Sequence, residues 1–367
     1  MKKTLIFCGA LILVTVGLSV YMKWEENGYK SDMQFSQELS LKDLAVKNNV
    51  PVKEILHGLS HKDHKLWDLP RNIPIKSLGV NIDEVRHALE HIKEESNPLR
   101  DVLKYILWSI WLSFILIVVL QQKRIKKIRI ITLLFSVFLF GVILGATPNP
   151  MESIVKLFKL FNGMEGDPKV LAMSFLLFTL FSLIGSKFIC SWGCQLGALQ
   201  ESIFNIPIFK KKYAFKMPFF ISLSVRLVLF TAFIFLLFGI GYRVVHGIKN
   251  FVIYHHVNYF KIFNLHDLAT IALYTLPILF VVSLFIYRPF CQFICPFGLY
   301  SWLLENIAFK KIKIIEDKCI KCTKCVEACP TQAMKEIYEK KRKHFLPDCW
   351  SCGACMEACP TDAIEYR

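Results

Sequence analysis

The sequence is poor in acidic residues, and its long apolar stretches contain no histidine. It has 29 Asp and Glu against 45 Lys and Arg in 367 residues. Haem b with two histidine ligands inside a bilayer therefore lacks support, and haem c lacks it too because no Cys-x2-Cys-His motif occurs. There is also no Walker A loop, dinucleotide fingerprint or nucleophilic triad pattern. Hydrolase and NAD(P)H dehydrogenase functions are thus without support.

Apolar residues are abundant and occur in long runs. They make up 54% of the chain, which has a mean hydropathy of +0.42. One helical crossing of a bilayer needs about 20 apolar residues. We therefore expect an all-α polytopic membrane protein with about six transmembrane helices. The six stretches are residues 4–21, 102–120, 130–147, 170–188, 218–240 and 268–287.

The distribution of charge predicts how these stretches are oriented. Two loops are strongly basic and the loops between them are less so, which places both termini in the cytoplasm by the positive-inside rule. The net charge of +16 then reflects membrane topology, and we expect no nucleic-acid partner. We predict a multi-pass protein of the bacterial inner membrane, with stretch 4–21 as an uncleaved anchor. The basic loops contain Lys123, Arg124, Lys126, Lys127 and Arg129, and Lys187, Lys210, Lys211, Lys212 and Lys216.

Eight cysteines form two identical runs near the C-terminus. Each run has the spacing Cys-x2-Cys-x2-Cys-x3-Cys-Pro of bacterial ferredoxins, in which the fourth cysteine binds the other cluster. The spacing predicts two [4Fe-4S] clusters, with zinc or disulfides as the alternatives. One cluster is assigned Cys319, Cys322, Cys325 and Cys359, and the other Cys349, Cys352, Cys355 and Cys329.

Two further cysteine pairs follow the fourth and sixth apolar stretches. Cys190 and Cys194 form one Cys-x3-Cys pair, and Cys291 and Cys295 form the other. A spacing of four puts two sulfurs on one helix face, so two such helix ends side by side would gather four thiols at the cytoplasmic membrane surface. That set suits a further Fe–S cluster, another metal or a redox-active dithiol. The alternative is inert cysteines in helix packing.

In this combination the chain resembles the NapH/NosR-type family of membrane-bound polyferredoxins. The matching elements are both Cys-x3-Cys pairs, the Pro148-Asn149-Pro150-Met151-Glu152 loop and the C-terminal cysteine runs, and they cover roughly residues 100–367. The resemblance implies quinol-linked electron transfer to a periplasmic reductase in anaerobic respiration. Gln195 stands where that family often has proline, and the flavin-binding external domain of its NosR branch is missing.

Four domains are expected. They are an anchor (1–21), a periplasmic helical domain (22–100), a transmembrane core (101–310) and an α+β 2[4Fe-4S] ferredoxin domain facing the cytoplasm (311–367). In the periplasmic domain we expect Ser40 to cap a helix. Its histidines either bind a metal or form a solvated polar face; they are His57, His61, His64, His87 and His91.

Candidates for acid-base or quinone chemistry are weaker. Arg226 lies inside the fifth apolar stretch, where a charge needs a partner or a cavity, and snorkelling to the membrane surface is the alternative. Quinol oxidation releases protons, for which Glu201 and Glu305 are candidates. Others flank the last two stretches on the opposite side: His255, His256, His266 and Asp267.

Three functions follow from these observations. The first is a quinol dehydrogenase-like component that moves electrons between the quinone pool, the Fe–S clusters and a periplasmic or membrane redox partner. The second is a metal-reducing assembly factor for a respiratory oxidase or reductase. The third is a redox-sensing membrane regulator.

Overall fold

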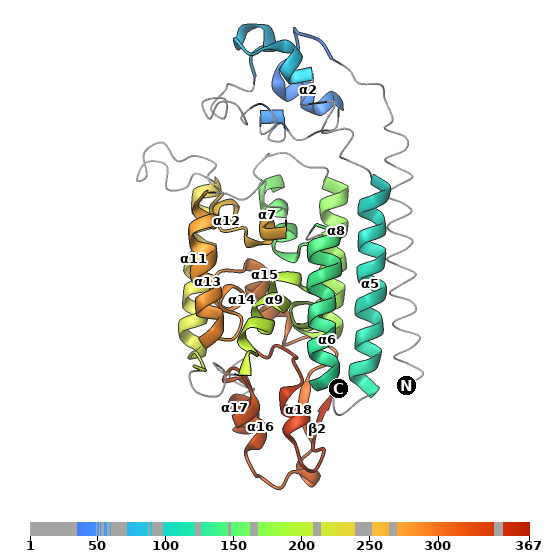
Figure 1. The fold of residues 1–367 in the computed structure, drawn as a ribbon, viewed down its shortest axis with the longest axis vertical. Helices are drawn as coiled ribbons and strands as arrows, with labels where there is room; N and C mark the ends of the chain where they lie inside the picture. Colours follow the sequence, from blue (N-terminus) through green and yellow to red (C-terminus); the bar gives the residue numbers. More distant parts are fainter. Residues whose placement is uncertain are drawn as a thin grey trace.

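The computed structural model is mostly helical. A bundle of helices occupies its middle, with a small helical module at one end and a cysteine-rich module at the other (Figure 1). The structure describes residues 35–48, 50, 52, 55–56, 59, 72–86, 89, 98–121, 126–145, 148–161, 168–207, 214–238, 252–263, 270–340 and 348–367.

Long helices form the outer part of the bundle, and most of their length is apolar. Shorter helices lie among them and carry the cysteine pairs (Figure 1). The long helices are α5 (Pro98–Gln121), α6 (Lys126–Ser136) with its π-helical continuation η3 (Val137–Ile143), α8 (Pro168–Gly185), α11 (Phe219–Phe238) and α13 (Thr270–Phe285). The short ones are α7 (Pro150–Phe161), η4 (Ile189–Gly193), α9 (Gln195–Phe204), α12 (Ile253–His256), η5 (Tyr259–Phe263), α14 (Pro289–Phe293) and α15 (Pro296–Leu304).

Two helices are long and apolar enough to cross a membrane in the part of the chain that the structure describes. They are Leu103–Leu120, within α5, and Phe219–Phe238, which is α11. Three shorter apolar helices span Arg129–Ile143, Leu171–Gly185 and Ile271–Phe285. The expected stretch 4–21 lies outside the described residues. Six transmembrane helices are therefore not supported, whereas a helical protein with two candidate spans is.

A residue with positive φ stands between each of the helices α8 and α13 and the cysteine pair that follows it. Ser186 follows α8 with φ 55°, and Arg288 precedes α14 with φ 47°. A non-glycine residue in this conformation breaks the helix and redirects the chain. The cysteine segments therefore turn back into the bundle, where α9 packs on α6 and α13, and α15 packs on α7 and α11.

The cysteine-rich module has a small two-stranded sheet. Strand β1 (Ile312–Ile314) pairs antiparallel with β2 (Ile364–Tyr366), with Ile312 opposite Tyr366. Between the strands lie η7 (Glu316–Lys318), α16 (Lys324–Ala328), α17 (Ala333–Tyr338) and α18 (Ala354–Ala358). The amides of Phe309 and Lys310 donate hydrogen bonds of 2.7 and 2.8 Å to the Leu183 and Ile184 carbonyls in α8. The module is thus joined to the bundle through the main chain.

The small module at the other end has its own apolar core. It includes α2 (Leu41–Asn48) and η2 (Ile75–Ser77), and its core contains Leu44, Ile55 and Leu89. The Ser40 hydroxyl accepts a 3.1 Å hydrogen bond from the Asp43 amide, which confirms the predicted N-cap.

Candidate electron-transfer centre

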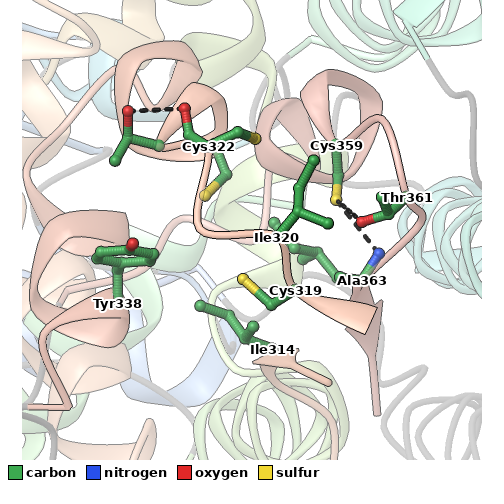
Figure 2. Close-up of a pocket in the computed structure, with 11 residues that line it drawn as sticks. Ile314, Cys319, Ile320, Cys322, Tyr338, Cys359, Thr361 and Ala363 are labelled. Atoms are coloured by element: carbon green, nitrogen blue, oxygen red, sulfur yellow. Dashed lines mark hydrogen bonds between the residues drawn. The ribbon is translucent and has the colours of Figure 1, made fainter. Parts of the chain in front are cut away.

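Each ferredoxin-type cysteine set lines one cavity. Cys319, Cys322, Cys325 and Cys359 line the first, and the sulfurs of Cys319, Cys322 and Cys359 turn toward a common space (Figure 2). The second cavity is lined by Cys329, Cys349, Cys352 and Cys355. The chain thus brings together the crossed sets that the spacing predicts, three sulfurs from one run and the fourth from the other.

These donor sets suit a [4Fe-4S] cluster, which takes one thiolate at each iron. Within the described ranges, no three His, Cys, Asp or Glu side chains come close enough to share a single metal ion. Burial raises the pKa of the Cys325, Cys349 and Cys355 thiols. They need bound iron to be held as thiolates, since metal binding displaces the thiol protons. A bound cluster would supply one-electron transfer.

The four cysteines of the Cys-x3-Cys pairs, here called the quartet, meet inside the bundle. All four are buried. Each thiol is close enough to the other three for a charge on one to affect the others, which is called electrostatic range below. Ser301 Oγ lies 3.8 Å from the Cys190 sulfur, and Gln200 Nε2 donates to the Cys291 sulfur at 3.8 Å. The chain therefore places the two duplicated motifs side by side, with few polar contacts around the sulfurs.

A glycine three residues after each pair makes this packing possible. A Cβ on Gly298 would lie 2.6 Å from the carbonyl oxygen of Cys291, and one on Gly197 would lie 3.0 Å from that of Cys190. The first distance is shorter than real Cβ contacts, and the second is tight; a Cβ on Gly197 would also lie 2.6 Å from Arg288 Nη1. Each short helix can therefore fold back onto its own cysteine loop only because glycine has no Cβ.

Buried cations surround the quartet. The Arg288 guanidinium donates to the carbonyls of Cys190 and Ser191, the latter at 2.8 Å. Arg226 donates to the Gly298 carbonyl at 3.0 Å. Lys187 is completely buried and within electrostatic range of Cys190. An anionic centre in an apolar interior needs such nearby positive charge.

Glu201 holds part of this charge in place. Its carboxylate accepts hydrogen bonds from Arg129 at 2.5 and 2.8 Å, from the Tyr287 hydroxyl at 2.6 Å and from Arg288 Nε at 2.8 Å. A carboxylate with so many donors is well suited to stay ionised as a structural anchor. Its use as a proton acceptor remains a prediction.

Asp348, the residue before Cys349, connects the ferredoxin module to the quartet. Its two carboxylate oxygens pair with Lys187 and with Arg226, the latter at 3.0 Å. Glu305 is also buried and accepts a 3.1 Å hydrogen bond from the Cys349 amide. Arg226 therefore has a carboxylate partner, as its place inside an apolar stretch requires.

Two tryptophans sit between the cysteine sites. Trp192, between Cys190 and Cys194, donates a 3.1 Å hydrogen bond to the Ser351 carbonyl in the second ferredoxin loop. Trp350, in that same loop, has the Lys187 ammonium 4.3 Å from its ring centroid, a cation–π contact. The second cysteine cavity and the quartet are thus in direct structural contact.

The sequence did not single out Lys187, Arg129, Arg288 and Asp348 as site residues. Lys187 and Arg129 were counted with the exposed basic loops, yet both are buried and ion-paired. Lys187 precedes Cys190 by three residues, and this position was the signal from which its role at the site could have been predicted. Side chains of the candidates His57, His61, His64, His87, His91, His255, His256, His266 and Asp267 lie outside what the structure describes.

Comparison with known families identifies three iron–sulfur segments. A 4Fe-4S dicluster domain matches residues 312–366, a second 4Fe-4S dicluster domain matches 289–333, and a 4Fe-4S binding domain matches 169–216. The first match contains all eight cysteines of the two crossed sets, the second contains Cys291 and Cys295, and the third contains Cys190 and Cys194. No solved structure matches the chain.

Among curated proteins, the chain is 27% identical over 202 residues to the "Putative electron transport protein YccM" of Escherichia coli (strain K12), covering 50% of this chain and 53% of that protein. It is 27% identical over 157 residues to the uncharacterized protein MJ0749 of Methanocaldococcus jannaschii, covering 42% and 55%. The chain thus spans about half the length of these relatives. Together the matches support an iron–sulfur electron-transfer function.

Proposed function

We propose that this protein is a multi-pass membrane electron carrier of the quinol-dehydrogenase type, with [4Fe-4S] clusters in the ferredoxin module and a further redox centre at the quartet. Electrons would pass between the quinone pool and a respiratory partner protein through these sites. The ferredoxin module would face the cytoplasm, as the basic loops predict.

The observation that carries this proposal is the shared ionic network. Lys187 and Arg226 both bind Asp348, next to Cys349, and both lie within electrostatic range of Cys190. A rigid connection of this kind keeps two redox sites at a constant separation. Neither an assembly factor nor a redox sensor requires such a connection, and the histidines relevant to metal delivery lie outside the described residues.

The residues around the quartet also suit a bound cubane. Four buried cysteines lie near one another there, and among the described residues the buried charged groups are four cations, Arg129, Lys187, Arg226 and Arg288, against three carboxylates, Glu201, Glu305 and Asp348. This small positive surplus would offset the negative charge of a thiolate-bound cluster. Both Cys-x3-Cys pairs also lie within segments that match 4Fe-4S domains.

Iron counting combined with electron paramagnetic resonance tests the proposal. Protein purified without oxygen should hold about 12 irons if the quartet binds a cubane, and about 8 if only the ferredoxin module does. Cys295→Ser should remove one cubane signal and leave two, whereas Cys355→Ser should remove a different one. Membranes should reduce the clusters on addition of a quinol. Absence of clusters, or clusters that quinol never reduces, would contradict the proposal.

A further inference from the structure

The two ferredoxin loops have positive φ at two equivalent positions but differ in their surroundings. In the first loop Lys321 and Thr323 have positive φ, of 57° and 59°. At the equivalent positions of the second loop, Ser351 and Gly353 have φ of 49° and 77°. Each loop begins at the residue before its first cysteine and ends at the residue after this second positive-φ position. Residues 318–324 therefore correspond one to one with residues 348–354.

The second loop is used entirely for internal docking. Asp348 binds two buried cations, Trp350 covers Lys187, and the Ser351 carbonyl accepts from Trp192. Asp348, Trp350 and Ser351 are all buried. The second loop thus contacts a cationic surface of the bundle through its acidic residue, its large apolar side chain and the Ser351 carbonyl.

The first loop presents the opposite charge to solvent. Lys318 replaces Asp348 and Ile320 replaces Trp350, and Ile320 is 63% exposed. Lys321, Lys324 and the cluster-cavity residue Cys322 are exposed as well. On the preceding η7, Glu316 pairs with Lys340 at 2.7 Å. The exposed Lys318, Lys321 and Lys324 then outnumber the exposed Asp317 and Glu327. An exposed apolar residue in a segment with a surplus of one charge sign suits a transient docking surface.

We infer that residues 318–324 form the docking surface for an acidic, water-soluble one-electron carrier protein. The inference rests on the proposed function and adds its partner. The carrier's carboxylates would face the three lysines, and its apolar contact would be Ile320. One electron leaves the reduced carrier and enters the centre bound by the first cysteine set, so the carrier is oxidised and that centre reduced by one electron each. No bond or proton is exchanged.

Stopped-flow reduction of the full-length protein in zwitterionic nanodiscs tests this. The probe is a reduced acidic carrier, either a flavodoxin or a small ferredoxin. The second-order rate constant should fall steeply with salt, as for electrostatically steered association. In the double variant Lys321→Glu/Lys324→Glu it should drop at least tenfold at low salt and approach the wild-type value at high salt. Ile320→Asp should lower it at all salt concentrations.

Two controls separate docking from damage. Lys335→Glu makes the same charge change at an exposed site on α17 and should stay within twofold of wild type. Reduced methyl viologen, a small reductant that needs no docking surface, should reduce every variant at least as fast as the wild type.

The alternatives give different results. If the double variant matches wild type and salt has no effect, the loop is a solvated face and the inference is wrong. If the double variant reduces binding of the protein to anionic vesicles but leaves carrier-driven reduction at the wild-type rate, the loop binds the membrane surface, which also overturns the inference. Missing clusters would instead contradict the proposed function. If the clusters are present and methyl viologen reduces them, but the carrier results fail, only the inference about the docking surface is wrong.

Discussion

Asp348 forms an ion pair with Lys187, 161 residues away in the sequence and in a different module, and both side chains are buried. The same carboxylate binds Arg226. One aspartate therefore pairs with two cations at the junction between the ferredoxin module and the helical bundle, and it directly precedes a cysteine of the second cavity. Several measurable consequences follow from this junction and from the quartet behind it.

Asp348→Asn should destabilise the junction strongly. Removing one partner of a buried ion pair leaves uncompensated charge, which costs about 3–5 kcal/mol. Limited proteolysis should cut the ferredoxin module faster, and thermal unfolding should begin earlier. The control is Glu316→Gln, which removes the exposed pair with Lys340 and should change neither measurement. Wild-type protease resistance in Asp348→Asn would show that the pair does not hold the module.

The quartet cysteines should act as one unit. Because all four sulfurs lie within mutual electrostatic range, loss of one should disable the whole site. Cys194→Ser and Cys295→Ser should each abolish quinol-linked electron transfer, and the double variant should be hardly worse than either. The ferredoxin clusters should remain in all three. Near wild-type rates in both single variants would identify these cysteines as packing residues.

Gly298→Ala should damage the quartet more than Gly193→Ala. The added methyl at position 298 meets a backbone carbonyl at 2.6 Å, whereas at position 193 it meets only side-chain atoms of Leu112, at 2.8 Å and beyond. A leucine side chain can rotate away, but the Cys291 carbonyl is fixed. Overpacking of this kind costs about 1–3 kcal/mol. Iron content and thermal stability of the two variants, compared side by side, measure the difference.

Tyr254→Phe should lower the reduction potential of a centre at the quartet. Tyr254 is buried, its hydroxyl has no hydrogen-bond partner among the described residues, and it lies within electrostatic range of Cys295. If this hydroxyl donates to thiolate sulfur once a centre is bound, it favours the more negative, reduced state. Its loss, at about 1 kcal/mol, corresponds to about 40 mV for one electron. Tyr259→Phe is the control, because that hydroxyl bonds to Thr275 at 2.7 Å.

Reporter fusions test the orientation. A reporter that works only in the periplasm should be inactive when fused after Arg367 and active when inserted after Gly163. The basic loops are the physical reason, since lysine and arginine near short apolar stretches remain on the cytoplasmic side. The reverse pattern would place the ferredoxin module outside and remove the basis for a cytoplasmic carrier.

The cysteine sites were accessible to sequence analysis because their ligands have local, repeated spacing. The crossing of Cys329 and Cys359 between sets also follows from a known motif, and the structure places each of them in the expected cavity. The role of Asp348 was not accessible in the same way. Its partners are distant in sequence, and no periodicity indicates which basic residues near an apolar stretch turn inward, as Lys187 and Arg129 do.

The number of membrane crossings was harder to predict for a related reason. Hydropathy is high both in a membrane-spanning helix and in a buried loop, so it cannot tell them apart. The apolar run therefore continues to Phe188, although α8 ends at Gly185. The helix stops just before Ser186, where φ is positive. A conformation at one residue thus decides the length of the helix, and composition averaged over twenty residues does not detect it.

The main-chain hydrogen bonds from Phe309 and Lys310 to α8 bear on the kinetics of electron flow. A module held by backbone contacts as well as by a buried ion pair does not need to swing between donor and acceptor. Electron hopping between its centres and the quartet should then be set by distance and driving force alone. The rate of electron transfer should therefore not depend on the viscosity of the medium. In carriers whose domains move on a flexible linker, the rate does depend on viscosity.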